Sequence, residues 1–531
     1  MPASPNSSSS RRSSVWLHAL AALVLLGALS ATALHYVHDQ GWTLWYGDAE
    51  AHLNIARRLT DAREPGYEQI GTVWLPLPHL LSAPLARDDE RWQDGRAGAI
   101  PAAAGFVLGG LFLFLAIRLV FDNVWAAWAG LGAYALNPNL LYLQSAPMTE
   151  PLFFACFFGT FWLLFRYRER PHWLNAAGAG LFAMLGALTR YDGWFVLPFF
   201  AFFVLFCAKE RSWKHVFTFS CIAALGPLWW LAHNQVLYSN TLEFYNGHWS
   251  AKAKYQRALD GGMAPYPGDH DLLKAAEYFM AAARLCLGSA LFWLGLIGAA
   301  AAAWLRAWWA LGLCLLLPVF YVLSLYSSGT PIFVPHLWPN SYYNTRYGLN
   351  LLPLAELGSA ALVTLAPQRF RWASAAAFLA IFASFWAIKP SPERVICWKE
   401  SQVNSEHRRF WTAEAAAYLG PRYKPGAGIF MMFGDLTGIL RAAGIPLRES
   451  FHESDLPPWM AAAARPELFL REEWAISFSG DAVSRTMHRL GRGPLRYQCV
   501  RMISTKGSPV VEIWRRTHDP DTIHQGAWRA Q

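Results

Sequence analysis

The chain has 531 residues, of which 54% are hydrophobic and 15% charged, and it contains 27 Trp. Soluble domains are nearer one quarter charged, so this composition excludes an ordinary soluble protein and indicates a membrane protein. The net charge of +9 does not indicate a nucleic-acid partner, because no polar segment combines a basic run with interleaved aromatic residues.

The N-terminal residues 1–14, MPASPNSSSSRRSS, are of low complexity, and we expect them to be disordered. The apolar segment that follows, 15–36, is long enough to span a bilayer. Ala31-Thr32-Ala33 fits the small-residue form of a signal-peptide cleavage site, but so short a match is common by chance. We interpret the segment as a retained membrane anchor.

Apolar runs of about 17–25 residues predict about eleven transmembrane helices between residues 15 and 389. Asn-Pro, Pro and Asp-Gly around 137–151 and 190–194 predict tight turns between neighbouring helices. The predicted spans are 15–36, 100–120, 124–144, 149–166, 173–189, 194–208, 215–235, 285–304, 308–326, 347–366 and 372–389.

Basic residues of the short loops fall on one side of these spans, which predicts that this side is cytoplasmic. The N-terminus is then cytoplasmic, and the loops 37–99, 236–283 and 327–346 are extracytoplasmic, together with everything after residue 390. The basic groups are Arg11/Arg12, Arg118, Arg166/Arg168/Arg170, Lys209/Arg211/Lys214, Arg306 and Arg369/Arg371.

The first outer loop begins with two acids, Asp48 and Glu50, followed by His52. The pattern over 48–61 predicts an amphipathic helix lying in the membrane interface. Asp48 is interpreted in two compatible ways. It caps this helix, or it is a general base for an acceptor hydroxyl or amine, made more basic by desolvation at the lipid–water boundary.

Two predicted helix starts on the same outer face also contain charged residues. Glu150 is the only acid between 124 and 165, and either caps its helix or positions the acceptor and helps to hold a cation. Arg190 and Asp192 share a tight turn, where they pair with one another or bind substrate.

The loop 327–346 ends at Arg346, next to Tyr347. The planar guanidinium of arginine suits phosphate oxygens, so we expect Arg346 to face an anionic headgroup, with a snorkelling arginine as the alternative. His336 is a secondary candidate in the same loop.

Carboxylates of the kind found at Asp48, Glu50 and Glu150 are ligands that divalent cations prefer. The Asp-Ala-Glu spacing is too common to be a metal signature, so we assign no metal site and no certain cofactor, and leave a divalent cation open. Of the seven cysteines, five lie in apolar segments, whereas Cys397 and Cys499 lie in the C-terminal region and could pair if it is extracytoplasmic.

After residue 389 the composition becomes that of a soluble domain, which we expect to be a small extracytoplasmic α/β domain over 390–531. The hydrophobic pattern predicts a strand then a helix, the same pair again, and a terminal hairpin. These elements are Ile429–Phe433, Leu436–Ala443, Trp474–Phe478, Asp481–Leu490, and Arg496–Ser504 joined to Pro509–Arg515.

Four stretches together resemble the GT-C superfamily of integral-membrane glycosyltransferases. The likeness is greatest to bacterial family-39-like enzymes, relatives of protein O-mannosyltransferases and of the lipid A aminoarabinose transferase, and it extends over roughly residues 10–390. The stretches are Tyr46–Glu50, Asn137–Pro151, Leu188–Gly193 and Thr345–Pro353.

The resemblance implies a polytopic α-helical domain over 15–389, in the bacterial inner membrane, whose outer loop contains the catalytic acid. It implies a sugar donor on polyprenyl phosphate and an acceptor that is a lipid, a glycan or a protein. Asp48 would be the catalytic acid, assisted by Glu150, and the donor phosphate would face Arg346 with Tyr347 and Arg190. The family often has two adjacent acids, whereas Ala49 separates Asp48 from Glu50 here, which leaves open which acid matters.

We therefore expect an inverting hexosyl or pentosyl transfer in which Asp48 deprotonates the acceptor. The remaining substrate-binding candidates are Glu50, His52, Asp192 and His336. The alternative is a transporter or flippase for a lipid-linked or polar substrate, which would need charges near the bilayer midplane. The candidate acids lie at the outer helix ends and favour an enzyme. A polymerase or ligase of lipid-linked glycans would share these features.

Overall fold

The computed structural model describes residues 6–207, 212–387, 392–455, 457–490 and 496–517. The chain divides into two compact units. The first unit comprises residues 1–44, 72–81 and 98–403, and the second comprises 45–71, 82–97 and 404–531. Residues 1–5 of the expected disordered segment, and Lys209 and Arg211 of one basic group, lie outside the described residues, whereas residues 6–14 form the beginning of the first helix.

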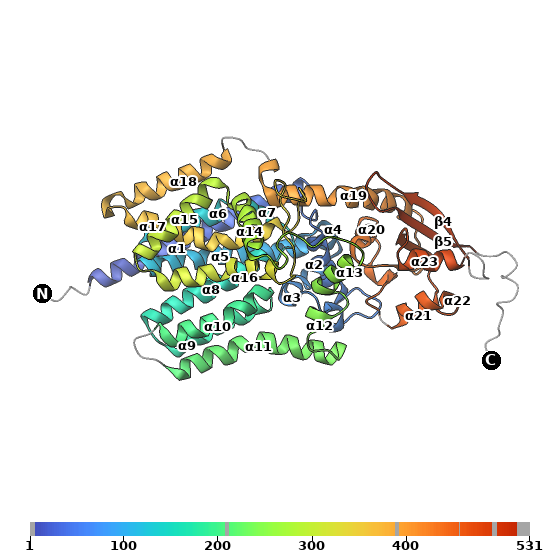
Figure 1. Cartoon of the computed structure of the whole chain (residues 1–531), viewed down its shortest axis with the longest axis horizontal. Coiled ribbons are helices and arrows are strands. Elements are labelled where there is room, and N and C mark those ends of the chain that lie inside the picture. Colours follow the sequence, from blue (N-terminus) through green and yellow to red (C-terminus); the bar gives the residue numbers. More distant parts are fainter. Residues whose placement is uncertain (1–5, 208–211, 388–391, 456, 491–495, 518–531) are drawn as a thin grey trace. The chain divides into compact units, whose positions relative to one another are not determined.

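The first unit is a bundle of helices (Figure 1). Its neighbours in contact include α15 with α17, α9 with α8 and α11, and α17 with α6. The helices are α1 (Asn6–Asp39), α5 (Arg96–Phe121), α6 (Val124–Ala135), α7 (Pro138–Leu143), α8 (Glu150–Glu169), α9 (Trp173–Ala187), α10 (Tyr191–Phe206), α11 (Trp213–Tyr238), α14 (Leu272–Leu287), α15 (Ser289–Trp304), α16 (Trp308–Tyr326), α17 (Leu352–Leu365) and α18 (Arg371–Ala387). Helix α19 (Ile396–Leu419) runs from the first unit into the second.

A helix occupies each of the predicted apolar segments, but fewer meet the requirements for a complete membrane span. Among the described residues, five helices are long and apolar enough, and the pair Leu272–Leu287 and Ser289–Trp304, bent by 114°, makes a sixth if it counts as one span. Together with the composition, these helices make the chain an integral membrane protein. The predicted span 124–144 is shorter in the structure because the Asn137 side chain accepts hydrogen bonds from Asn139 N (3.0 Å) and Leu140 N (3.2 Å) and starts a separate helix.

Close helix packing in this unit depends on small residues, as in other membrane bundles. A Cβ added at Gly298 would lie 2.2 Å from the carbonyl oxygen of Gly358. Any larger residue there would force α15 and α17 apart.

The second unit contains a five-stranded sheet of order β2-β1-β3-β5-β4. Strand β1 pairs in parallel with β2 and β3, whereas β5 is antiparallel to β3 and β4. The strands are β1 (Ile429–Met431), β2 (Ser450–Phe451), β3 (Trp474–Phe478), β4 (Arg496–Ile503) and β5 (Val511–Thr517). The predicted strands, the two helices between them and the terminal hairpin are confirmed within a few residues, and β2 is too short to have a sequence signal.

Helix α2 (Gly47–Arg58), in the first predicted outer loop, belongs to this second unit. The predicted helix over 48–61 is confirmed as α2, and its polar side is buried as well as its apolar side. Its place in the membrane interface stays a prediction. Asn54 donates to Thr437 Oγ1 (2.8 Å) and accepts from Trp92 Nε1 (3.1 Å). Buried polar groups need such partners, which the amphipathic pattern alone does not reveal.

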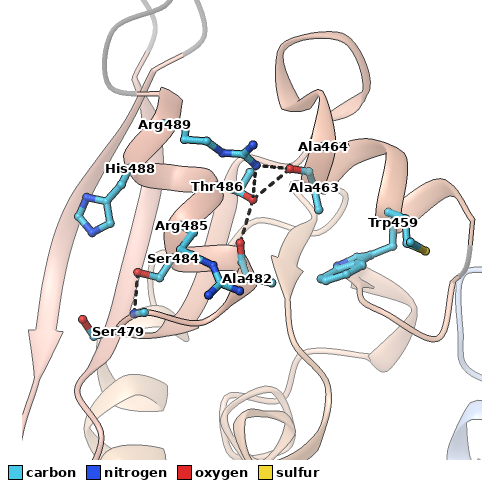
Figure 2. Close-up of a pocket in the computed structure, with 12 residues that line it drawn as sticks. Trp459, Ala463, Ala464, Ser479, Ala482, Ser484, Arg485, Thr486, His488 and Arg489 are labelled. Carbon is cyan, nitrogen blue, oxygen red and sulfur yellow. Dashed lines mark hydrogen bonds between the residues drawn. The ribbon is translucent and has the colours of Figure 1, made fainter. Parts of the chain in front are cut away.

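Two short helices, α21 (Pro458–Ala464) and α23 (Ala482–Arg489), flank a groove of about 820 Å³ in the second unit. Figure 2 shows Trp459 on one side of this groove and Thr486 on the other, with hydrogen bonds joining the two helices. Arg489 and Thr486 both donate to the carbonyl oxygen of Ala463, the latter at 3.2 Å. These bonds fix α23 against α21.

Candidate functional site

Four predicted site residues lie together in the first unit, with one acid that the sequence did not indicate. We call Glu150, Arg190, Asp192, Arg346 and Glu400 the charged cluster. Glu150 begins α8, and Asp192 lies in the first turn of α10, where the partial positive charge of a helix N-terminus favours a carboxylate. The cluster therefore forms at helix ends that the basic residues predict to be extracytoplasmic.

Arg346 reaches this cluster because its short 3-10 helix, η3 (Thr345–Leu351), lies close against α14. A Cβ added at Gly348 would be 2.4 Å from the backbone of Ala282 and Ala283, so only glycine permits this approach. Asn344, which precedes η3, has a φ of +54°, a left-handed conformation that asparagine tolerates better than most residues. The turn aims the following arginine into the bundle.

Glu150 is the centre of the charged cluster. Its side chain is 2% exposed, and its Oε1 atom accepts from Arg190 Nη1 at 2.9 Å and from Arg346 Nε at 3.1 Å. The ring of Tyr347 faces both guanidinium groups, with centroid distances of 5.5 Å to Arg190 and 5.1 Å to Arg346. One carboxylate oxygen and one aromatic ring thus contact both cations.

The predicted pairing of Arg190 with Asp192 is confirmed, and Tyr321 of α16 joins it. Arg190 Nε lies 3.3 Å from Asp192 Oδ2, which also accepts from the Tyr321 hydroxyl at 2.9 Å. Arg190 Nη2 in turn donates to the Tyr321 oxygen at 2.5 Å. Tyr321 had no sequence signal, because a tyrosine inside an apolar span is usual.

Glu400, on α19, was also missed by sequence reasoning because it lies among many other charged residues. Its carboxylate accepts from the backbone N–H groups of Asn344 (2.9 Å) and Thr345 (2.8 Å), and it lies 3.6 Å from Arg346 Nη1. Burial raises the pKa of Glu400, while Arg346 and the Thr345 and Asn344 donors oppose that rise. With Glu400 protonated, the two positive charges of the charged cluster, on Arg190 and Arg346, would be balanced by its two remaining carboxylates.

We expect the variant Glu400→Gln to be more stable than the wild type at neutral pH, with the difference vanishing near pH 4.5, the ordinary pKa of a glutamate. A carboxyl whose folded-state pKa is raised loses stability as the pH rises from the unfolded pKa through the folded one. Each unit of the shift amounts to about 1.4 kcal/mol. Thermal unfolding of both proteins from pH 4 to 8 measures this. A variant that is less stable than the wild type at every pH would contradict it.

Asp48 lies in the second unit, in the first turn of α2, and is half-buried. The interpretation of Asp48 as the helix cap is wrong, because α2 starts at Gly47 and Tyr46 occupies the capping position. Asp48 therefore lies within the first turn and not at the capping position. Its predicted role as a base stays a prediction.

The other two candidates on α2 are buried within the same helix. Glu50 is ion-paired with Arg408 Nε at 3.5 Å and with Arg441 Nε at 3.3 Å. His52, two residues further along the helix, is also buried. His336 is exposed in the loop between α16 and η3 and lies outside the charged cluster. In the part of the chain that the structure describes, no three His, Cys, Asp or Glu side chains gather as a metal-binding group.

No protein-family model matches the sequence, and no curated protein matches it. Among solved structures, ArnT from Cupriavidus metallidurans bound to undecaprenyl phosphate is similar, with a TM-score of 0.52 and 12% identity over 92% of this chain and 97% of that chain. The apo state of the same protein has a TM-score of 0.49 and 12% identity, over 91% of this chain and 97% of that chain. An apo oligosaccharyltransferase from Archaeoglobus fulgidus has a TM-score of 0.46 and 12% identity, over 87% of this chain and 69% of that chain. The first of these likenesses shows that this chain shares a fold with that protein.

Proposed function

We propose that this membrane protein is a glycosyltransferase that moves a sugar from a polyprenyl-phosphate donor to an acceptor on the outer face of the bacterial inner membrane. The observation that favours this most is the pair of guanidinium groups, Arg190 and Arg346, held together by Glu150 at the helix ends. The fold is shared with a protein that binds undecaprenyl phosphate, and a lipid phosphate needs cations at such a depth.

In this proposal, Arg346 and Arg190 receive the phosphate as it leaves the sugar. Glu400 lies 3.6 Å from the Arg346 guanidinium, beyond a good hydrogen bond, and has backbone donors of its own. The phosphate would therefore displace Glu400 from Arg346, while Glu150 keeps both arginines oriented. The leaving group is already anionic, so its stabilisation is electrostatic and needs no general acid.

Asp48 is the proposed base. It takes the proton of the acceptor hydroxyl as that oxygen attacks the anomeric carbon, and the bond from this carbon to the phosphate oxygen breaks. A single displacement inverts the configuration at the anomeric carbon. His52, Asp192 and His336 are proposed substrate contacts. Glu50, because it is paired with Arg408 and Arg441, is proposed to position α2.

Release of polyprenyl phosphate from sugar-charged lipid tests the proposal. The full chain, purified in detergent, is incubated with a lipid extract that contains polyprenyl-phosphate sugars and potential acceptors. We expect free polyprenyl phosphate to accumulate with time, and the variant Asp48→Asn to release none above background. Equal release by wild type and variant would show that Asp48 is not the base. No release by either, when the extract supports a known transferase, would refute the proposal.

A transporter is the second candidate, and Glu356 is the observation that favours it. This acid lies inside α17, is 0% exposed, and is an exception to the pattern in which the candidate acids gather at outer helix ends. Ionisable residues at such depth often mark transport pathways. Detergent separates the two candidates, because transport across a membrane is impossible there whereas transfer proceeds.

A further inference from the structure

Two cysteines lie directly behind the charged cluster. Cys286 is near the end of α14, and Cys397 is in the first turn of α19, three residues before Glu400. Residues three apart on a helix share a face, so Cys397 and Glu400 lie one above the other. Both thiol side chains are 0% exposed, and both residues belong to the first unit.

The side chain of Asn139 holds these two cysteines together. Its Nδ2 donates to the carbonyl oxygen of Cys286 at 2.9 Å, and its Oδ1 accepts from the backbone N–H of Cys397 at 2.9 Å. A second asparagine, Asn137, donates to the same Cys286 oxygen at 3.1 Å. The amide of Asn139 therefore bridges the two backbones and satisfies an N–H at the start of α19, where no intrahelical partner exists.

The two thiols also lie close together. Burial, with the nearby thiol of Cys286 as a further cause, raises the pKa of the Cys397 thiol, and Cys286 Sγ donates to the carbonyl oxygen of Thr345 at 3.1 Å. Thr345 in turn donates its N–H to Glu400. The sulfur pair is thus joined through single contacts to the segment that positions Arg346.

We propose that Cys286 and Cys397 form a disulfide bond in the mature protein, which fastens α19 to the end of α14 behind the charged cluster. The predicted extracytoplasmic position of these helix ends gives access to an oxidising compartment. All seven cysteines are free thiols in the structure, so neither this bond nor the Cys397–Cys499 pairing considered from the sequence is formed in it. The proposal does not depend on the transferase function.

The bond forms by thiol–disulfide exchange with an external disulfide, a small molecule or a protein. One cysteine thiolate attacks a sulfur of that disulfide and releases its other half as a thiol. The second cysteine then attacks the mixed disulfide and releases the remaining half, so two cysteine thiols are oxidised while one disulfide is reduced to two thiols. Because both side chains are fully buried in the folded chain, exchange occurs during folding.

Thiol counting tests the proposal. Full-length protein in membranes from a host with an oxidising outer compartment is quenched with acid, unfolded and labelled with a polyethylene-glycol maleimide. We expect two fewer labels than the chain's seven cysteines, and all seven after reduction. Seven labels before reduction would refute the proposal.

Three variants identify the bonded pair. In Cys286→Ser and in Cys397→Ser, every remaining thiol should be labelled without reduction. In the matched control Cys499→Ser, two thiols should stay protected, whereas their exposure would mean that Cys499 is a partner and would refute the proposal. Peptide mass spectrometry of the unreduced wild type should find the 286–397 linkage, and a different linkage would also refute it.

Access to reductant gives a second readout. We expect dithiothreitol to leave the bond intact in the folded protein and to reduce it only after denaturant is added, because neither sulfur is exposed. The bond closes a loop of about 110 residues, so Cys397→Ser should unfold a few degrees lower than the wild type, and Cys499→Ser should not. Equal unfolding temperatures for the two variants would count against the bond.

Discussion

Replacing Asp48 by asparagine is expected to lower the rate of sugar transfer by about 10²–10⁴-fold, the usual contribution of a positioned general base. The asparagine keeps the size of the side chain and its place in the first turn of α2, but it accepts no proton at neutral pH. The chain should stay folded, since asparagine and aspartate have nearly the same shape. Initial rates of polyprenyl-phosphate release and thermal unfolding measure both effects.

Two matched variants separate this chemistry from loss of structure. Asp89→Asn removes an acid of the same predicted loop whose side chain is 74% exposed. Its partner Arg57 still has its ion pair with Asp61, at 2.7 Å, so turnover should be unchanged. Glu50→Gln weakens pairs with Arg408 and Arg441 in a buried position, so it should lower the unfolding temperature. Full turnover by Asp48→Asn would show that another group is the base.

Sequence reasoning predicted the helices and strands well, because hydrophobic periodicity is a local property. Trp474–Phe478 was predicted and found as β3 with the same bounds. The same reasoning predicted α2 as a helix but did not predict which groups cover its polar side. The partners of that helix, such as Thr437 and Arg441, lie almost 400 residues further along the chain. No local pattern indicates which distant segment will cover a polar face.

The charged cluster was predictable for a different reason. Ionisable residues at membrane depth are costly, so Glu150, Arg190 and Arg346 stood out in apolar surroundings. Glu400 and Tyr321 did not, since a charge in a polar helix and a tyrosine in an apolar one are both ordinary. Their roles arise from three-dimensional contacts alone, with Thr345 and Asp192 respectively.

Replacing Arg346 by lysine is expected to reduce transfer by about 10²-fold, the typical loss when one donor to a developing anion is removed. Lysine keeps the positive charge but not the planar fork, so it cannot hold Glu150 through Nε and meet a phosphate with the same group. We expect both a raised KM for the donor lipid and a lower kcat. Kinetics over a range of donor concentrations separate the two.

The comparison with Glu150→Gln then distinguishes phosphate binding from a purely structural role for Arg346. Glu150 Oε1 contacts both arginines, at 2.9 Å and 3.1 Å, so its loss should disorient the pair and affect transfer even though Glu150 itself meets no phosphate. Because the two residues act through one contact, the double variant should lose less than the sum of the single losses, with a coupling of about 0.5–3 kcal/mol. Arg118→Lys, at the other end of α5 from the predicted outer loop, is the control, and it should leave KM and kcat unchanged. If Arg346→Lys lowers only the unfolding temperature and leaves KM and kcat unchanged, Arg346 is a structural ion-pair partner and the phosphate is bound elsewhere.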